Sequence, residues 1–132
     1  FDAVFISPNT KIKYPFSELG LAPEVGSSYL LFQALGYQQA AQLLFQSKII
    51  DGIKYYELGL AKYVGDDFLD QANSYARDLK EQSLSSIIET KAILKSFMLE
   101  DLAKARSMET KAMKKLFGSE DNLKAVEKFF NK

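Results

Sequence analysis

The sequence predicts an α/β protein that is predominantly helical, with two or three short strands in its first half. Three observations predict this class. Short apolar runs rich in aromatic and β-branched residues lie within residues 1–14 and 60–64. Apolar residues recur at intervals of three and four over most of residues 66–132. The length of 132 residues and the hydrophobic content of 47% suit one domain with its own core.

Two strands are expected before residue 15. Residues 1–6 are apolar on both alternations, so both faces of this strand should be covered. Residues 10–14 alternate strictly and place every second side chain on one buried face. Because two strands do not form a stable sheet alone, we expect a larger sheet upstream or on a partner chain. The absence of an initiator methionine at Phe1 also suggests an excised piece.

Residues 15–28 then lead from the strands into the helices. Pro15 ends the second strand and Gly20 permits a tight turn. Pro23 suits the first position of a helix, which predicts that Glu24 lies in the first helical turn. That helix should stop at Gly36.

The remaining elements follow from caps and periodicity. Asp51 is placed to cap a short helix that ends before Gly59, and Ser119 is placed to cap the last helix. The elements expected after Gly36 are helices over about residues 37–46, 52–58, 66–80, 84–97, 99–117 and 120–130, with a short strand over 60–64.

The composition excludes several classes of function. Lys+Arg and Asp+Glu are both 17, so no broad footprint for nucleic acid is expected. No apolar run reaches the roughly 18 residues of a membrane span, and no targeting signal is present. Cysteine and histidine are absent, which excludes a thiol nucleophile, a histidine base and a histidine-ligated metal site. Proton chemistry therefore falls to Asp, Glu, Lys, Tyr or a partner.

Glu24 is the candidate for that chemistry. A helix N-terminus would favour its charged form, whereas a dry acyl pocket would favour its protonated form. On spacing alone, a glutamate at a helix start is more often only a favourable residue for that position. Gly26 is costly inside a helix, so a close approach of backbone or ligand is expected there.

Two stretches of the sequence resemble the enoyl-CoA hydratase/isomerase (crotonase) family. They are residues 1–5, Phe-Asp-Ala-Val-Phe, and residues 16–28, Phe-Ser-Glu-Leu-Gly-Leu-Ala-Pro-Glu-Val-Gly-Ser-Ser. Within that family they look like the peroxisomal-type Δ3,Δ2-enoyl-CoA isomerases. The similarity continues through residues 49–61 and, with weaker motifs, to residue 132. It implies the C-terminal half of a crotonase fold. Residues 1–65 would be the end of the core with the active-site segment, and residues 66–132 the C-terminal helical region of the same, incomplete domain.

The resemblance also implies an activity. Typical hydratases carry a glutamate where Phe16 aligns and a glycine where Glu24 aligns, so this sequence has the isomerase arrangement. Glu24 would take a proton from carbon 2 of a 3-enoyl-CoA and return it to carbon 4, as in fatty-acid β-oxidation. The substrate is a coenzyme A thioester, and no further cofactor or metal is implied. The residues expected to contact the substrate are Phe16, Leu19, Leu21, Val25, Gly26 and Lys128.

In the family, the oxyanion donors and the main adenine-binding loop lie upstream, so the isolated 132-residue chain is expected to be inactive. The terminal helices build a trimer in the family, which implies a trimer or a dimer of trimers for the full-length protein and association of the isolated chain through exposed apolar stripes. Peroxisomal, mitochondrial and bacterial cytoplasmic locations all stay open.

Several alternatives stay open as well. Leu19, Leu21 and Val25 are equally suited to a core, and Lys128 shares its spacing with Lys124 and Lys132 on what is more commonly a solvated helix face. The protein could be a non-catalytic acyl-CoA-binding relative, or an enoyl-CoA hydratase or thioesterase of the same fold. A helical interaction module without a small-molecule site is the remaining alternative.

Overall fold

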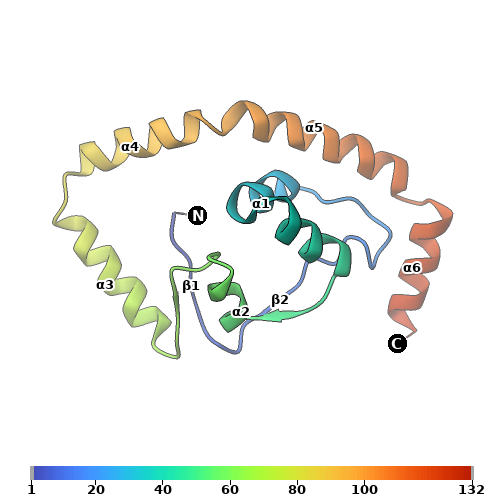
Figure 1. Cartoon of the computed structure of the whole chain (residues 1–132), viewed down its shortest axis with the longest axis horizontal. Coiled ribbons are helices and arrows are strands. Elements are labelled where there is room, and N and C mark those ends of the chain that lie inside the picture. Colours follow the sequence, from blue (N-terminus) through green and yellow to red (C-terminus); the bar gives the residue numbers. More distant parts are fainter. Residues whose placement is uncertain (1, 132) are drawn as a thin grey trace. The chain divides into compact units, whose positions relative to one another are not determined.

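A computed structural model describes residues 2–131 (Figure 1). The chain forms two compact units. The first unit joins the segment up to Ile12 with Ile50–Leu99, and the second joins Lys13–Ile49 with the segment from Glu100 onward. Neither unit is continuous in sequence. The division expected at residue 65 stays a prediction.

The strands of the first unit are short and form two separate pairs. β1 (Phe5–Ile6) pairs in parallel with β4 (Tyr63–Val64), with Phe5 opposite Tyr63. β2 (Lys11–Ile12) pairs antiparallel with β3 (Ile50–Asp51). The prediction of a few short strands is confirmed.

The first unit also holds three helices in its described residues, and α2 begins at the cap that the sequence predicts. In α2 (Gly52–Glu57) the Asp51 carboxylate accepts a hydrogen bond of 2.8 Å from the backbone N–H of Lys54. Gly59 ends this helix with φ +76°, which is the left-handed conformation that glycine adopts without strain. α3 (Phe68–Lys80) packs against β1, where the rings of Tyr75 and Phe5 lie 5.6 Å apart. α4 (Leu84–Ser96) follows.

A hydrogen bond at the start of α3 gives the first unit a pH-dependent contact. The Tyr63 hydroxyl donates to an Asp67 carboxylate oxygen at 2.6 Å. This bond, together with one from Gln71, lowers the pKa of Asp67, and the same carboxylate acceptor raises the pKa of Tyr63. The contact therefore stabilises the fold only while Asp67 is ionised and Tyr63 is protonated.

We expect Tyr63→Phe to lower the free energy of unfolding, by an amount that stays constant between about pH 5 and pH 9. The increment should shrink as the pH falls through the lowered pKa of Asp67, and again as it rises through the raised pKa of Tyr63. Urea unfolding of both proteins, from below the lowered pKa of Asp67 to above the raised pKa of Tyr63, measures the difference in their free energies of unfolding. Tyr56→Phe is the control, because Tyr56 is 47% exposed and its hydroxyl makes no hydrogen bond within residues 2–131. A difference that does not change with pH contradicts the prediction.

The second unit contains the other helices. α1 (Ser27–Gln46) consists of two helical segments that meet at Gly36, whose φ of 72° and ψ of 171° are not helical. The predicted stop at Gly36 and the helix that follows it are both confirmed. α5 (Leu99–Leu116) and α6 (Glu120–Phe130) are separated by a turn at Gly118, and the Ser119 hydroxyl caps α6 at the backbone N–H of Asn122.

The start of α1 differs from the prediction. The helix begins at Ser27, so Glu24 precedes it instead of lying in its first turn, and Pro23 is not its first residue. Val25 and Gly26 both have positive φ, of 54° and 83°. Two consecutive left-handed residues cannot continue a right-handed helix, and they delay its start by one turn.

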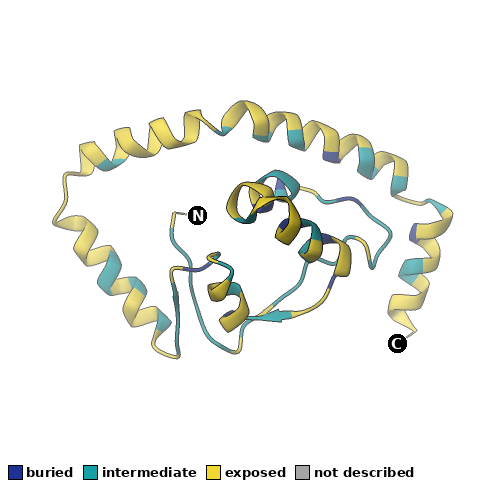
Figure 2. Cartoon of the chain, viewed as in Figure 1, coloured by how far each residue is buried: buried dark blue, intermediate teal, exposed yellow. Residues whose placement is uncertain are grey.

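Few side chains of either unit are fully buried. The buried hydrophobic residues within the described part of the chain are Ala22, Leu31, Ala40, Leu44 and Ala61. Figure 2 shows α4 exposed along almost its whole length, and Leu84 and Phe97 at its two ends are 69% and 74% exposed. The exposed apolar stripes expected from the sequence are present, whereas the association they imply stays a prediction. Of the helices in residues 2–131, none is long and apolar enough to span a membrane.

Candidate functional site

The Pro15–Ser28 segment forms a loop of two turns in the second unit. The backbone N–H of Leu21 donates to the carbonyl of Phe16 at 2.8 Å and closes the first turn. Gly20 has φ +66°, and a Cβ at this position would lie 2.9 Å from the Cα of Asn122 in α6. The predicted turn at Gly20 is therefore confirmed, and the close approach of α6 excludes a side chain there.

Buried polar side chains hold this loop at three places. Within residues 2–131 the buried polar residues are Ser47, Glu109 and Asn122, and each one bonds to the loop or to the residue just before it. The Asn122 side-chain amide donates to the carbonyl of Leu19 at 2.7 Å. The Ser47 hydroxyl donates to the carbonyl of Tyr14 at 2.9 Å. Because an unpaired polar group is costly in a buried position, these residues define the path of the loop.

Glu109 makes the most extensive of these contacts. It lies on α5 and is 6% exposed. One carboxylate oxygen accepts from the backbone N–H of Gly26 at 2.7 Å. The other accepts from the backbone N–H of Ser28 at 2.9 Å and from its hydroxyl at 2.6 Å. Glu109 therefore caps the N-terminus of α1, where Gly26 has no side chain that could do so.

A cavity of about 350 Å³ lies beside the loop. Among residues 2–131, Glu24 is the one charged residue on its wall, and the other lining side chains are apolar. They come from the loop and from the end of α5 with the residue that follows it: Pro15, Phe16, Leu19, Leu21, Met113 and Phe117. The structure thus brings together four of the residues that the sequence analysis assigned to the site, namely Glu24, Phe16, Leu19 and Leu21.

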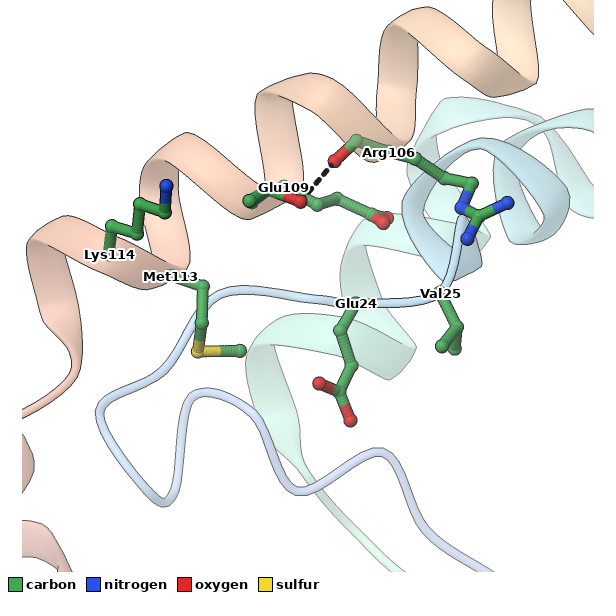
Figure 3. Close-up of a pocket in the computed structure, with 7 residues that line it drawn as sticks. Glu24, Val25, Arg106, Glu109, Met113 and Lys114 are labelled. Carbon is green, nitrogen blue, oxygen red and sulfur yellow. Dashed lines mark hydrogen bonds between the residues drawn. The ribbon is translucent and has the colours of Figure 1, made fainter.

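A second cavity of about 280 Å³ shares Glu24 and Met113 with the first (Figure 3). Val25 and Glu109 also line it. In Figure 3 the Glu24 side chain extends away from α5, whereas the Glu109 side chain extends from α5 toward the loop. The two carboxylates therefore have different surroundings, and only Glu109 is engaged by the N-terminus of α1.

The other predicted contact residues have different environments. Val25 is 76% exposed on the edge of the second cavity, and Gly26 is buried. A Cβ on Gly26 would lie 2.4 Å from a methyl group of Leu102, so the close approach expected there is made by a side chain of α5. Lys128 is exposed on α6 and lines neither of these cavities. The three residues stay predictions as substrate contacts.

The sequence analysis missed Glu109 as part of this site, although a signal was available. The apolar stripe of α5 runs through Leu102, Ala105, Ala112 and Leu116, and Glu109 occupies the position between its two halves. A carboxylate on the buried stripe of a helix needs hydrogen-bond donors from another element. The sequence could therefore have indicated that Glu109 has a partner, but not that the partner is the loop at Gly26.

Comparison with known proteins places the chain among proteins of similar sequence and fold. Residues 1–132 match the family model described as "Enoyl-CoA hydratase/isomerase". The chain is 28% identical to a Bacillus subtilis protein named "Putative enoyl-CoA hydratase/isomerase YhaR" and 26% identical to a "Probable enoyl-CoA hydratase" of Rhizobium meliloti. Each match covers 99% of this chain and 52% of the relative.

Among solved structures, OdaA of Pseudomonas aeruginosa superimposes with a TM-score of 0.88 at 30% identity, over 99% of this chain and 54% of that one. The chain thus spans about half the length of the proteins it matches. The matches do not confirm the prediction that this half is the C-terminal one.

Proposed function

Because the chain belongs to the enoyl-CoA hydratase/isomerase (crotonase) family and has its fold, we propose that the whole protein is a Δ3,Δ2-enoyl-CoA isomerase. It would move the double bond of a 3-enoyl-CoA to position 2, with Glu24 as the base that carries the proton. The substrate is an acyl thioester of coenzyme A. The alternatives are an enoyl-CoA hydratase and an acyl-CoA-binding relative without activity.

The observation that carries this proposal is the single carboxylate on the apolar cavity. Glu24 shares the wall of a cavity of about 350 Å³ with six apolar residues. A proton that moves between two carbon atoms of one substrate needs one base and little water, since water would exchange the proton. An apolar wall also suits the alkyl part of an acyl chain.

The reaction balances with Glu24 as the only proton carrier. The carboxylate removes a proton from carbon 2, and the electrons of that C–H bond form a double bond between carbons 1 and 2 while the carbonyl electrons move onto the thioester oxygen. When the carbonyl forms again, the electrons between carbons 1 and 2 shift to form the double bond between carbons 2 and 3. The former double bond between carbons 3 and 4 takes up the proton at carbon 4, and Glu24 returns to its charged form. Between these steps the negative charge lies on the thioester oxygen, where hydrogen-bond donors must stabilise it. The resemblance assigns those donors to parts of the protein that this sequence does not include.

The position of Phe16 favours isomerisation over hydration. Addition of water to a double bond requires a group that positions the water, and the resemblance aligns the hydratase glutamate with Phe16. Phe16 instead contributes an apolar ring to the cavity wall. The other nearby carboxylate, Glu109, accepts three hydrogen bonds from the protein and faces the second cavity. The presence of Glu24 favours an enzyme over a relative that only binds acyl-CoA.

An assay of the intact protein with two substrates tests the proposal. We expect a 3-enoyl-CoA to be converted to the conjugated 2-enoyl-CoA, followed by its ultraviolet absorbance. In deuterated water, part of the product should carry at carbon 4 the hydrogen that left carbon 2, because one base carries the proton. Faster hydration of a 2-enoyl-CoA would favour the hydratase. Binding of an acyl-CoA with neither reaction would favour the non-catalytic relative.

A further inference from the structure

The loop that carries Glu24 is strained next to that residue. Val25 has φ +54°, a left-handed conformation that a β-branched residue rarely adopts. Such a conformation is costly and persists only where its surroundings hold it in place. The side chain of Val25 is 76% exposed, so packing of that side chain does not supply the restraint. The restraint must act on the backbone beside it.

Glu109 supplies that backbone restraint. Its two carboxylate oxygens bind the N–H groups of Gly26, which follows Val25 directly, and of Ser28, three residues beyond Val25. Hydrogen bonds to a charged acceptor are about twice as strong as neutral ones, and two such bonds to one carboxylate also fix the orientation of the groups that donate them. Both hydrogen bonds are made while Val25 and Gly26 have their left-handed conformations.

The backbone between Gly26 and Glu24 transmits this restraint to the base. Gly26 is two residues from Glu24, and the carbonyl of Glu24 accepts hydrogen bonds from the N–H of Ser27 at 3.0 Å and from its hydroxyl at 2.7 Å. Residue 24 is thus joined to the first turn of α1, which Glu109 caps. Met113, one turn beyond Glu109 on α5, lines the same cavity as Glu24. The same helix therefore forms part of the cavity wall and fixes the backbone two residues from the base.

We propose that Glu109 is a positioning residue for Glu24, and this inference rests on the proposed function. Glu109 takes up the N–H groups at the start of α1, so that Glu24 stays outside the helix, where it lines the apolar cavity. A misplacement of about 1 Å in a catalytic group can cost about a hundredfold in rate. Loss of Glu109 should therefore lower kcat by about this factor, with little change in KM.

The test is a double-mutant cycle in the intact protein. Glu109→Ala is measured alone and combined with Glu24→Gln. If Glu109 acts through Glu24, its loss lowers kcat about a hundredfold in the wild-type background and causes no further loss when Glu24 is already replaced. An equal loss in both backgrounds would mean a general structural effect and would overturn the inference. Glu127→Ala is the matched control, since Glu127 is exposed on α6 and its side chain makes no hydrogen bond within residues 2–131.

A second variant and a second measurement keep the inference testable if Glu109→Ala does not fold. Glu109→Gln keeps the shape of the side chain and one hydrogen-bond acceptor oxygen. It should therefore fold, and its kcat should lie between those of the wild-type protein and Glu109→Ala. Amide hydrogen exchange should become faster at Gly26 and Ser28 in this variant and stay unchanged in Glu127→Ala. Unchanged exchange at both amides would contradict the positioning role even if kcat fell. Absence of isomerisation by the wild-type protein would instead contradict the proposed function, so the two failures are distinguishable.

Discussion

Glu24→Gln in the intact protein is expected to lower the rate of 3-enoyl-CoA isomerisation by about three orders of magnitude. Glutamine has nearly the shape of glutamate but cannot accept the proton that must leave carbon 2. No histidine or cysteine exists in this sequence, and the other residues on the wall of the 350 Å³ cavity are apolar. No neighbouring side chain on that wall can therefore replace the lost base.

The loss should appear in kcat and leave KM almost unchanged, because the substitution removes a group that acts in the reaction steps. Steady-state rates with a 3-enoyl-CoA measure both constants. Unfolding in urea should show equal stability, since the Glu24 side chain is exposed. Glu127→Gln removes an exposed carboxylate elsewhere and should retain full activity. Wild-type rates in the Glu24→Gln protein would remove Glu24 from the mechanism.

Gly52→Ala is expected to destabilise the protein by about 3 kcal/mol. Gly52 is buried at the start of α2, and its N–H donates to the carbonyl of Pro8 at 3.1 Å. A Cβ at this position would lie 2.1 Å from the carbonyl oxygen of Ser7 and 3.3 Å from the Cα of Pro8. These atoms belong to the backbone, so the turn at Ser7 and Pro8 would have to move. That movement would weaken the hydrogen bond from the Gly52 N–H to the Pro8 carbonyl.

Urea unfolding of the intact protein measures this effect, and Gly59→Ala provides a matched comparison. Gly59 has φ +76° but nothing within 4 Å of the position of its Cβ. Alanine there should cost about 1 kcal/mol, from backbone strain alone. If Gly52→Ala cost no more than Gly59→Ala, the turn at Ser7 would be free to move aside, and the close contact would not contribute to stability.

Local signals in the sequence were sufficient for most element boundaries. The stop at Gly36, the cap at Asp51 and the cap at Ser119 all occur where the residue types predict them. Each depends on contacts within about four residues, and such contacts are encoded directly by neighbouring side chains. The family resemblance was also correct at the level of the fold and the enoyl-CoA hydratase/isomerase family. The isomerase assignment stays a proposal.

The start of α1 could not be predicted in the same way. Pro23 followed by Glu24 is a favourable helix start, and nothing local opposes it. The actual start at Ser27 depends on left-handed conformations at Val25 and Gly26, and valine has no intrinsic preference for such a conformation. A residue 81 positions away from Ser28 makes that backbone path favourable.

The sequence by itself determined the order of the helices, the short strands other than β3 (Ile50–Asp51), and the absence of histidine and cysteine chemistry in this chain. These properties follow from residue type and short-range spacing, whereas Glu24 as the candidate base follows from the family resemblance. Only the tertiary structure decided that Glu24 lies outside α1 on an apolar cavity, and that Glu109 occupies the helix N-terminus in its place. The reason is that a helix N-terminus binds whichever carboxylate the fold brings to it, and long-range packing decides which one arrives.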